Sequence, residues 1–233
     1  YGTVFVLPVY LAQIQDYSAL QIGQVIMWMG VPQLLIIPLV PILMRFIAAR
    51  LLCSCGFFLF AFASFYSGSL SLDFAGDQFI AIQIFRAFGQ PMVLVPMSII
   101  ATAMIAPSQA GSASSLYNIL RNLGGAIGIA ALATILDSRA KYYFDFLREH
   151  ITPGNPAFEE RMHLLTSQLS NEQSALQLLS NQVHQQAAIM AYNDAFHLIA
   201  IMLGCSMVFV LLCSPLPKAP PQTSQGEPEP AHP

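Results

Sequence analysis

The stretch IFRAFGQPMVLVPM, residues 84–97, sets one arginine and two prolines inside a run that is otherwise almost entirely apolar. A helix of a soluble protein would carry Arg86 on a polar face, but here apolar residues continue on every side. The whole chain shares this character, because 55% of its 233 residues are hydrophobic and only 9% are charged. Soluble domains carry about a quarter charged residues, so the composition indicates a membrane protein.

Long apolar blocks recur along the chain, and they cover approximately residues 1–12, 20–44, 51–66, 79–106, 111–136 and 192–216. A bilayer-spanning helix needs about 20 residues, so the first block is too short, and we interpret it as a truncated span. Lipid offers no hydrogen-bond partners, so every block is expected to be a helix. The predicted fold class is an all-α membrane protein with about five full spans and one truncated span.

The predicted organisation has four parts. Transmembrane helices occupy residues 1–136, an amphipathic helical loop outside the cytoplasm occupies 137–191, the final span occupies 192–216, and a disordered proline-rich tail occupies 217–233. In the loop, apolar residues recur at steps of three and four, with a break expected near 152–156. Three interpretations of this loop stay open: a helix folded back on the bundle, a docking surface for an external partner, and a segment bound to the membrane surface.

Basic residues predict the orientation in the membrane. Arg45, Arg50 and Lys218 all fall on one side, whereas the short loops of the opposite side contain aspartates and no basic residue. Because cytoplasmic loops are enriched in Lys and Arg, the C-terminus is expected in the cytoplasm. Arg139 and Lys141 run against this assignment, but they begin a long connection, and long segments follow the rule weakly.

Arg86 is expected to face the interior of the helical bundle. It lies roughly 12 Å from the outer end of its span, against a hydrocarbon half-thickness of about 15 Å. Gln83 and Gln90 share its face at helical spacing, and a charge at this depth costs at least about 2.5 kcal/mol if it meets lipid. Two roles stay open: lining the solute cavity or tuning a proton-carrying carboxylate, and tying the bundle together through a neighbouring helix. Gly89 and Pro91 predict a kink or close packing beside this polar stripe.

The fifth span also combines polar and small residues. A GxxxG step favours close helix packing, and a polar stripe on the same helix is expected either to line the cavity or to hydrogen-bond another helix. Arg121 is expected to reach the cytoplasmic face or the cavity. The residues concerned are Asn118 and Asn122 on the stripe, and Gly124, Gly125 and Gly128 for packing.

In the last span, Asp194 and His197 lie three residues apart, so they could share an exchangeable proton. A simpler interpretation is a solvated helix start capped by Asn193 or Asp194.

Other classes of function find little support. The sequence has no GxSxG or HExxH motif and no cysteine–histidine metal spacing, so we expect neither an enzyme nor a metal or organic cofactor. Nine basic residues and a net charge of −3 give no footprint for nucleic acid.

Three stretches of the sequence are similar to a known protein family: residues 85–97, 108–130 and 191–198. They resemble the C-terminal half of the fourteen-span drug:proton antiporters of the major facilitator superfamily, especially the EmrB/QacA group. The resemblance implies export of hydrophobic or amphipathic compounds from the bacterial inner membrane by alternating access, driven by the proton gradient. It also implies a missing N-terminal half, a periplasmic adaptor protein and an outer-membrane channel as partners. Arg86 would be the counterpart of the arginine in the superfamily's RxxxG motif.

The sequence departs from the family pattern in one loop. Residues 44–52 retain only Arg45 and Arg50 of a more basic gating motif. The proton-coupling residues of the first half are also absent. The alternative function is a truncated, non-transporting membrane scaffold.

Overall fold

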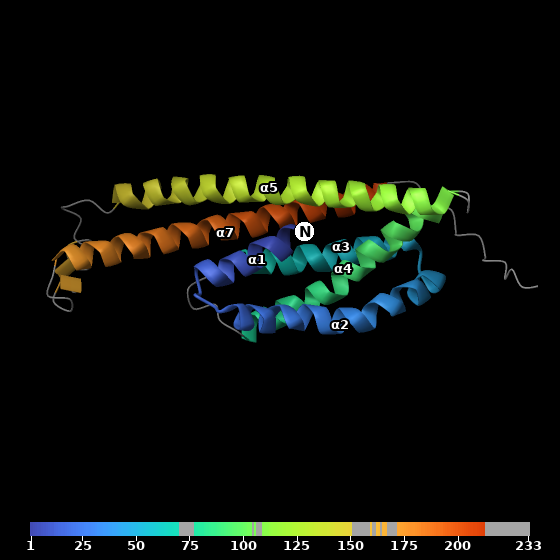
Figure 1. Ribbon diagram of the computed structural model, residues 1–233, viewed down its shortest axis with the longest axis horizontal. Coiled ribbons are helices and arrows are strands. Elements are labelled where there is room, and N and C mark those ends of the chain that lie inside the picture. The colour runs from blue at the N-terminus through green and yellow to red at the C-terminus, as the bar shows by residue number, and fades with distance from the viewer. Residues whose placement is uncertain are drawn as a thin grey trace, which may run out of the picture.

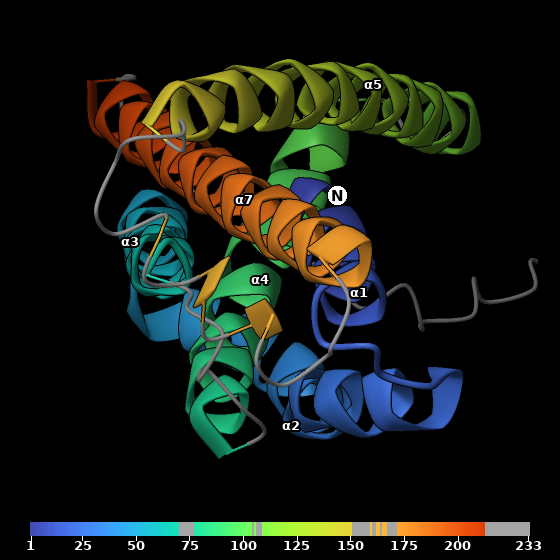
Figure 2. The same ribbon diagram turned by 90° about the vertical axis from the view of Figure 1, so that its left-hand side faces the viewer.

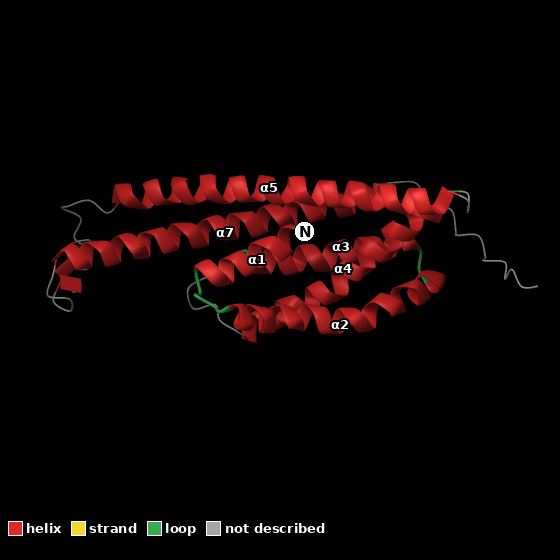
Figure 3. Ribbon diagram, in the orientation of Figure 1, coloured by secondary structure: helices red, strands yellow, loops and turns green. Residues whose placement is uncertain are grey.

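The computed structural model describes residues 1–69, 77–103, 105, 109–150, 159, 162–163, 165–166 and 172–212. Its elements are all helices over this part of the chain (Figure 3). They are α1 (Gly2–Gln13), α2 (Ala19–Phe46), α3 (Ala49–Ser67), α4 (Asp77–Ala103), α5 (Ala110–His150) and α7 (Glu172–Leu212). The helices lie roughly along one long axis, as Figure 1 shows.

Local sequence explains how these helices begin and persist. At the start of α2, the Ser18 side chain accepts from the backbone N–H of Gln21, and the Gln21 side chain caps the Ser18 N–H in return. This capping box satisfies two amides that the first helical turn leaves open. Three prolines lie inside α2 and two inside α4, and both helices continue through them. Neighbouring helices make such prolines tolerable in membrane spans.

Five of the helices are long and apolar enough to cross a membrane, and α1 is a shorter apolar helix. Many of their large hydrophobic side chains face outward, among them Leu34, Leu35, Leu120, Ile127 and Phe209. Water would make such a surface very unfavourable, whereas lipid tails match it. The predicted all-α membrane bundle with five full spans and one short span is therefore confirmed.

Helices α5 and α7 are longer than the sequence predicted. Each has 41 residues, so at 1.5 Å per residue each is about 60 Å long, roughly twice the hydrocarbon thickness. The helix of the fifth span continues past Leu136 to His150, and the last helix begins at Glu172, well before Tyr192. The physical reason is that no proline or glycine occurs at these boundaries, so the helical backbone continues. The break expected near 152–156 lies outside the described residues.

The extra lengths form one antiparallel pair, which we call the outer hairpin: residues 137–150 of α5 and 172–191 of α7. Figures 1 and 2 show α5 and α7 running side by side, and α5 also touches α4 and α1. The apolar stripe predicted in this segment is exposed in part, since Leu176 is 45% and Met190 36% exposed. Ala187 of the same stripe is buried, as is Ala175, and small side chains of this kind let two helices approach closely.

The core surrounds α1. Val6, Tyr10 and Leu11 of this helix have no exposed surface, and they belong to a cluster with Phe79 of α4 and Phe196 of α7. The backbones of α3 and α4 approach each other closely at two glycines. A Cβ atom on Gly56 would lie 2.8 Å from the carbonyl oxygen of Gly89, and one on Gly89 would lie 2.9 Å from that of Gly56. This crossing fixes the position of the arginine one turn earlier in α4.

Candidate functional site

Arg86 lies inside the bundle, with only 1% of its surface exposed. Its Nη1 donates to Oε1 of Gln83 at 3.0 Å, and its Nη2 donates to Oγ of Ser67 at 2.9 Å. The guanidinium carbon stands 5.5 Å from the centre of the Phe196 ring, which is within range of a cation–π contact. Residues of α3, α4 and α7 thus surround the charge.

The charge of Arg86 has no acidic partner among the described residues, because none of their carboxylates lies within 4.0 Å of it. Its Nε atom is buried and has no hydrogen-bond partner in this part of the chain. A buried guanidinium with two neutral hydrogen bonds is incompletely compensated. This arrangement suits a residue that ties α4 to α3, the second of the two roles considered for Arg86.

A small cavity borders Arg86 and Gln83 on the side of α1 and α2. Its volume is about 30 Å³, and Thr3, Leu7, Pro8 and Met29 are among the other residues that line it. A cavity of this size holds about one or two water molecules. Drug-sized ligands need about 300 Å³ or more, so this cavity does not admit one. The role of Arg86 in lining a solute cavity stays a prediction.

The other residues of the polar stripe on α4 have different surroundings. Gln90 does not join the hydrogen bonds of Arg86, and its Oε1 is buried without a partner in the described chain. Gly89 makes the close contact with α3, and Pro91 is fully buried within an unbroken helix.

The polar stripe of α5 is turned away from Arg86. Asn118, Arg121 and Asn122 are all exposed, and Oδ1 of Asn122 accepts a hydrogen bond from the Tyr1 hydroxyl at 2.7 Å. Helix α5 packs chiefly against α7 and contacts α4 only slightly. The described residues therefore do not bring this stripe and Arg86 together into one polar passage.

The glycines of α5 differ from one another. A Cβ on Gly125 would meet the ring of Tyr1 at 2.7 Å, whereas nothing lies within 4 Å of such an atom on Gly124 or Gly128. The GxxxG step thus makes no helix contact within the described chain, because its face is on the outside of the bundle. Any close packing there needs a partner from outside these residues.

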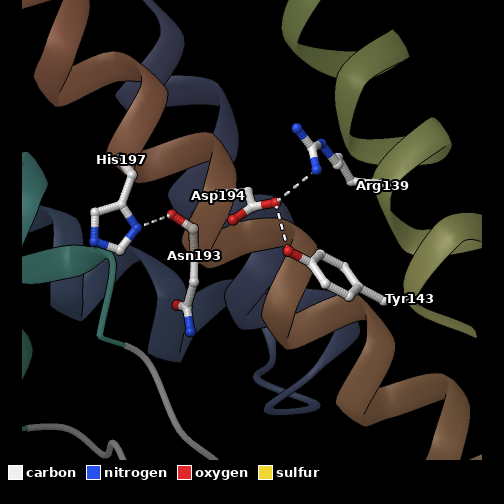
Figure 4. A network of polar contacts seen from close by, with 5 residues as sticks. All are labelled: Arg139, Tyr143, Asn193, Asp194 and His197. Carbon is white, nitrogen blue, oxygen red and sulfur yellow. Dashed lines mark hydrogen bonds and ion pairs between the residues drawn. The ribbon is translucent and has the colours of Figure 1, made fainter. Parts of the chain in front are cut away.

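Asp194 lies in the middle of α7, so the interpretation of Asn193 or Asp194 as a helix cap is wrong (Figure 4). Its Oδ2 accepts a hydrogen bond from the Tyr143 hydroxyl at 2.8 Å and lies 3.6 Å from Nη1 of Arg139. The Arg139 side chain is 53% exposed, so the ion pair contributes little by itself. Together these contacts join α5 to α7 at the foot of the outer hairpin.

The alternative that Asp194 and His197 share a proton is not supported either, because the two side chains have different partners (Figure 4). Nδ1 of His197 bonds the backbone carbonyl oxygen of Asn193 at 2.9 Å, and its ring packs edge-on against Phe65 at 5.2 Å. Side chains three residues apart on a helix can meet, but here they point to different neighbours. The Asp194 side chain points toward α5, and the His197 side chain points toward α3.

Several participants could not be identified from the sequence. Ser67, Phe196 and Tyr143 come from segments far from their partners, and their roles depend on which helices meet. Ser67 is the last residue of α3, and in the sequence it begins a serine-rich polar stretch, so nothing marks it as a partner of Arg86. Among the described residues, no group of three or more His, Cys, Asp or Glu side chains could hold a metal ion.

The fold and these contacts define a multi-pass, all-α membrane bundle built around a buried arginine. The chain is 29% identical over 208 residues to the colistin resistance protein EmrB of Acinetobacter baumannii, covering 87% of this chain and 41% of that protein. It is 26% identical to the fatty acid resistance protein FarB of Neisseria gonorrhoeae, over 91% of this chain and 40% of FarB. It is 25% identical to the probable multidrug resistance protein EmrY of Escherichia coli, over 97% and 43% of the two chains.

These relatives agree with the resemblance drawn from the sequence: nearly the whole chain is similar to part of several EmrB-type and other MFS-type transporters. It spans less than half the length of the curated relatives that it matches. No protein-family model matches the chain.

Proposed function

We propose that this chain is the C-terminal helical bundle of a multidrug exporter, which expels hydrophobic or amphipathic compounds in exchange for protons. The observation that carries the proposal is the similarity of nearly the whole chain to proteins named for resistance to colistin, fatty acids and multiple drugs. The proton gradient is the energy source, and the protein lies in the bacterial inner membrane with its C-terminus in the cytoplasm.

The exposed face of α5 supports this proposal. It carries Asn118, Asn122, Gly124 and Gly128 together with large apolar side chains, and much of it has no contact within the bundle. Small and polar residues favour close helix contacts inside a membrane and are of little use against lipid. In the proposed transporter, this face meets the N-terminal half and lines the route of the exported compound.

The outer hairpin provides a surface for a periplasmic adaptor protein, through which an outer-membrane channel would be reached. Its α5 arm projects about 20 Å beyond the hydrocarbon if that span leaves the membrane near Leu136, and it exposes Tyr142 and Phe146 at 58% and 46%. Exposed aromatic side chains outside the membrane are typical of protein interfaces.

Dye efflux tests the proposal. The full-length transporter is produced in bacteria that lack their own exporters, and ethidium efflux is followed with and without a protonophore. We expect efflux that stops when the protonophore is added, and we expect Asn118→Leu to reduce its rate at least fivefold. Ser112→Ala, an exposed change on another face of α5, is the control and should leave the rate unchanged. Normal expression without efflux of any amphipathic compound would favour the scaffold alternative instead.

A further inference from the structure

The guanidinium of Arg86 uses only part of its hydrogen-bonding capacity among the described residues. Arginine has five N–H donors, and two of those of Arg86 donate, one to Gln83 and one to Ser67. Both partners are neutral, and Nε is buried with no partner in this part of the chain. A buried positive charge with neutral partners is costly, so an anion placed beside it would stabilise the folded bundle.

The small cavity between α1, α2 and α4 lies directly against this charge. Its polar lining residues are Thr3, Gln83 and Arg86, and its apolar lining residues are Val4, Leu7, Pro8, Ile26 and Met29. A volume of about 30 Å³ has room for one chloride or bromide ion, which is only slightly larger than a water molecule. Val4 is 53% exposed, so the cavity reaches the surface of the described bundle and an ion can enter it.

The polar groups at the cavity favour a negative charge. Because Oε1 of Gln83 accepts from Arg86, the amide nitrogen of Gln83 can donate its N–H groups to another partner. The hydroxyl of Thr3, a residue that is only 4% exposed, is a further donor. None of the lining residues is acidic. A lining with one positive charge, several donors and no carboxylate selects an anion over a cation.

We propose that this cavity binds a small monovalent anion such as chloride or bromide, held by Nε of Arg86 and by the side chains of Gln83 and Thr3. The ion neutralises a charge that is otherwise buried alone, and it links α4 to α1. Its attraction to Arg86 is strong because the surrounding side chains are mostly apolar and screen the two charges poorly. Gluconate is too large for the cavity. The site goes beyond the proposed function, since it holds an inorganic ion and no exported compound.

Thermal unfolding of the purified full-length transporter in uncharged detergent micelles tests the site. The melting temperature should be about 2–4 °C higher in sodium chloride than in sodium gluconate of equal ionic strength, because a ligand of the folded state alone stabilises that state. Sodium bromide should have the same effect as sodium chloride. Binding is also measured directly, as saturable broadening of the NMR line of chloride that bromide reverses and gluconate does not.

Three variants assign the binding to this cavity. Arg86→Gln removes the charge, so it should weaken chloride binding at least about tenfold and abolish the difference in melting temperature. Arg148→Gln removes an exposed arginine of the outer hairpin and is the matched control, which should leave both measurements unchanged. Thr3→Val removes a hydroxyl at nearly constant size and should weaken binding about threefold. It decides the matter if Arg86→Gln does not fold.

Two results would overturn the proposal. One is a parent protein with equal melting temperatures in chloride and gluconate and no saturable line broadening, which would indicate a carboxylate from outside the described residues as the partner of Arg86. The other is a chloride response that the folded cavity variants retain, or that Arg148→Gln loses as fully as Arg86→Gln does. Neither measurement requires transport. Proton-driven efflux without anion binding therefore supports the proposed function and overturns the site, and anion binding without efflux does the reverse.

Discussion

The substitution Ser67→Ala tests whether Arg86 ties α4 to α3. The Ser67 hydroxyl accepts from Arg86 at 2.9 Å and donates to the carbonyl oxygen of Ala63 at 2.8 Å, and only 1% of the residue is exposed. Among the described residues, alanine would leave the guanidinium with Gln83 as its one remaining hydrogen-bond partner. We therefore expect a loss of folding stability that depends on the presence of Arg86.

The magnitude follows from the surroundings of the bond. A hydrogen bond to a charged group contributes about 1.5–3 kcal/mol, whereas polar pairs in membrane proteins average about 0.6 and reach about 1.7 kcal/mol. Because Arg86 is almost completely buried, we place this pair near the upper end of the range for polar pairs in membrane proteins. The adjacent 30 Å³ cavity has room for a water molecule that could replace the lost hydroxyl, which limits the effect. We expect a coupling free energy of about 1.5 kcal/mol between Ser67 and Arg86.

Ser64→Ala is the matched control. Ser64 is also fully buried on α3, and its hydroxyl donates to the carbonyl oxygen of Phe60 in its own helix, whereas the hydrogen bonds of Arg86 go to Gln83 and Ser67. Ser64→Ala should lower the free energy of unfolding by about 0.5 kcal/mol or less, since only a hydrogen bond within the helix is lost. The free energy of unfolding is measured in mixed micelles for Ser67→Ala, Arg86→Met and the double variant. A coupling below about 0.5 kcal/mol, or an equal cost for Ser64→Ala, would refute the tie.

Two further substitutions test the packing of the helices. Gly89→Ala should lower the free energy of unfolding by about 1–3 kcal/mol, because its Cβ would lie 2.9 Å from the carbonyl oxygen of Gly56. Gly204→Ala has open space around its Cβ and should be neutral or stabilising in the same unfolding assay; equal losses at both positions would contradict a close α3–α4 contact. Tyr143→Phe removes the hydroxyl that donates to Asp194, so amide hydrogen exchange in the outer hairpin should become about fivefold faster. Exchange at the parent rate would show that this hydrogen bond does not hold the hairpin together.

The sequence predicted the membrane class and most of the spans, because each of these features depends on local composition. An apolar block near 20 residues long must be helical in lipid wherever its neighbours lie. The same argument placed Arg86 and Gln83 away from lipid, and the structure has them bonded inside the bundle. The family resemblance also depended on local motifs and needed no tertiary information.

The ends of α5 and α7 were predicted less well. Hydropathy is low between Asp137 and Tyr192 and high on either side of this segment. This pattern marks the boundary of the hydrocarbon and carries no information on where a helix begins or ends. Both helices continue through those boundaries because the polar residues there are compatible with helical structure. The cap assigned to Asp194 failed for the same reason.

The amino-acid sequence by itself determined that this chain lies in a membrane as helices and that its one deeply placed arginine avoids lipid. Tertiary structure alone decided that Ser67 and Phe196 meet that arginine, that Gly56 opposes Gly89, and that Tyr143 holds Asp194. The physical reason is that the period of a helix fixes which residues share a face, whereas the packing of whole helices determines which faces meet.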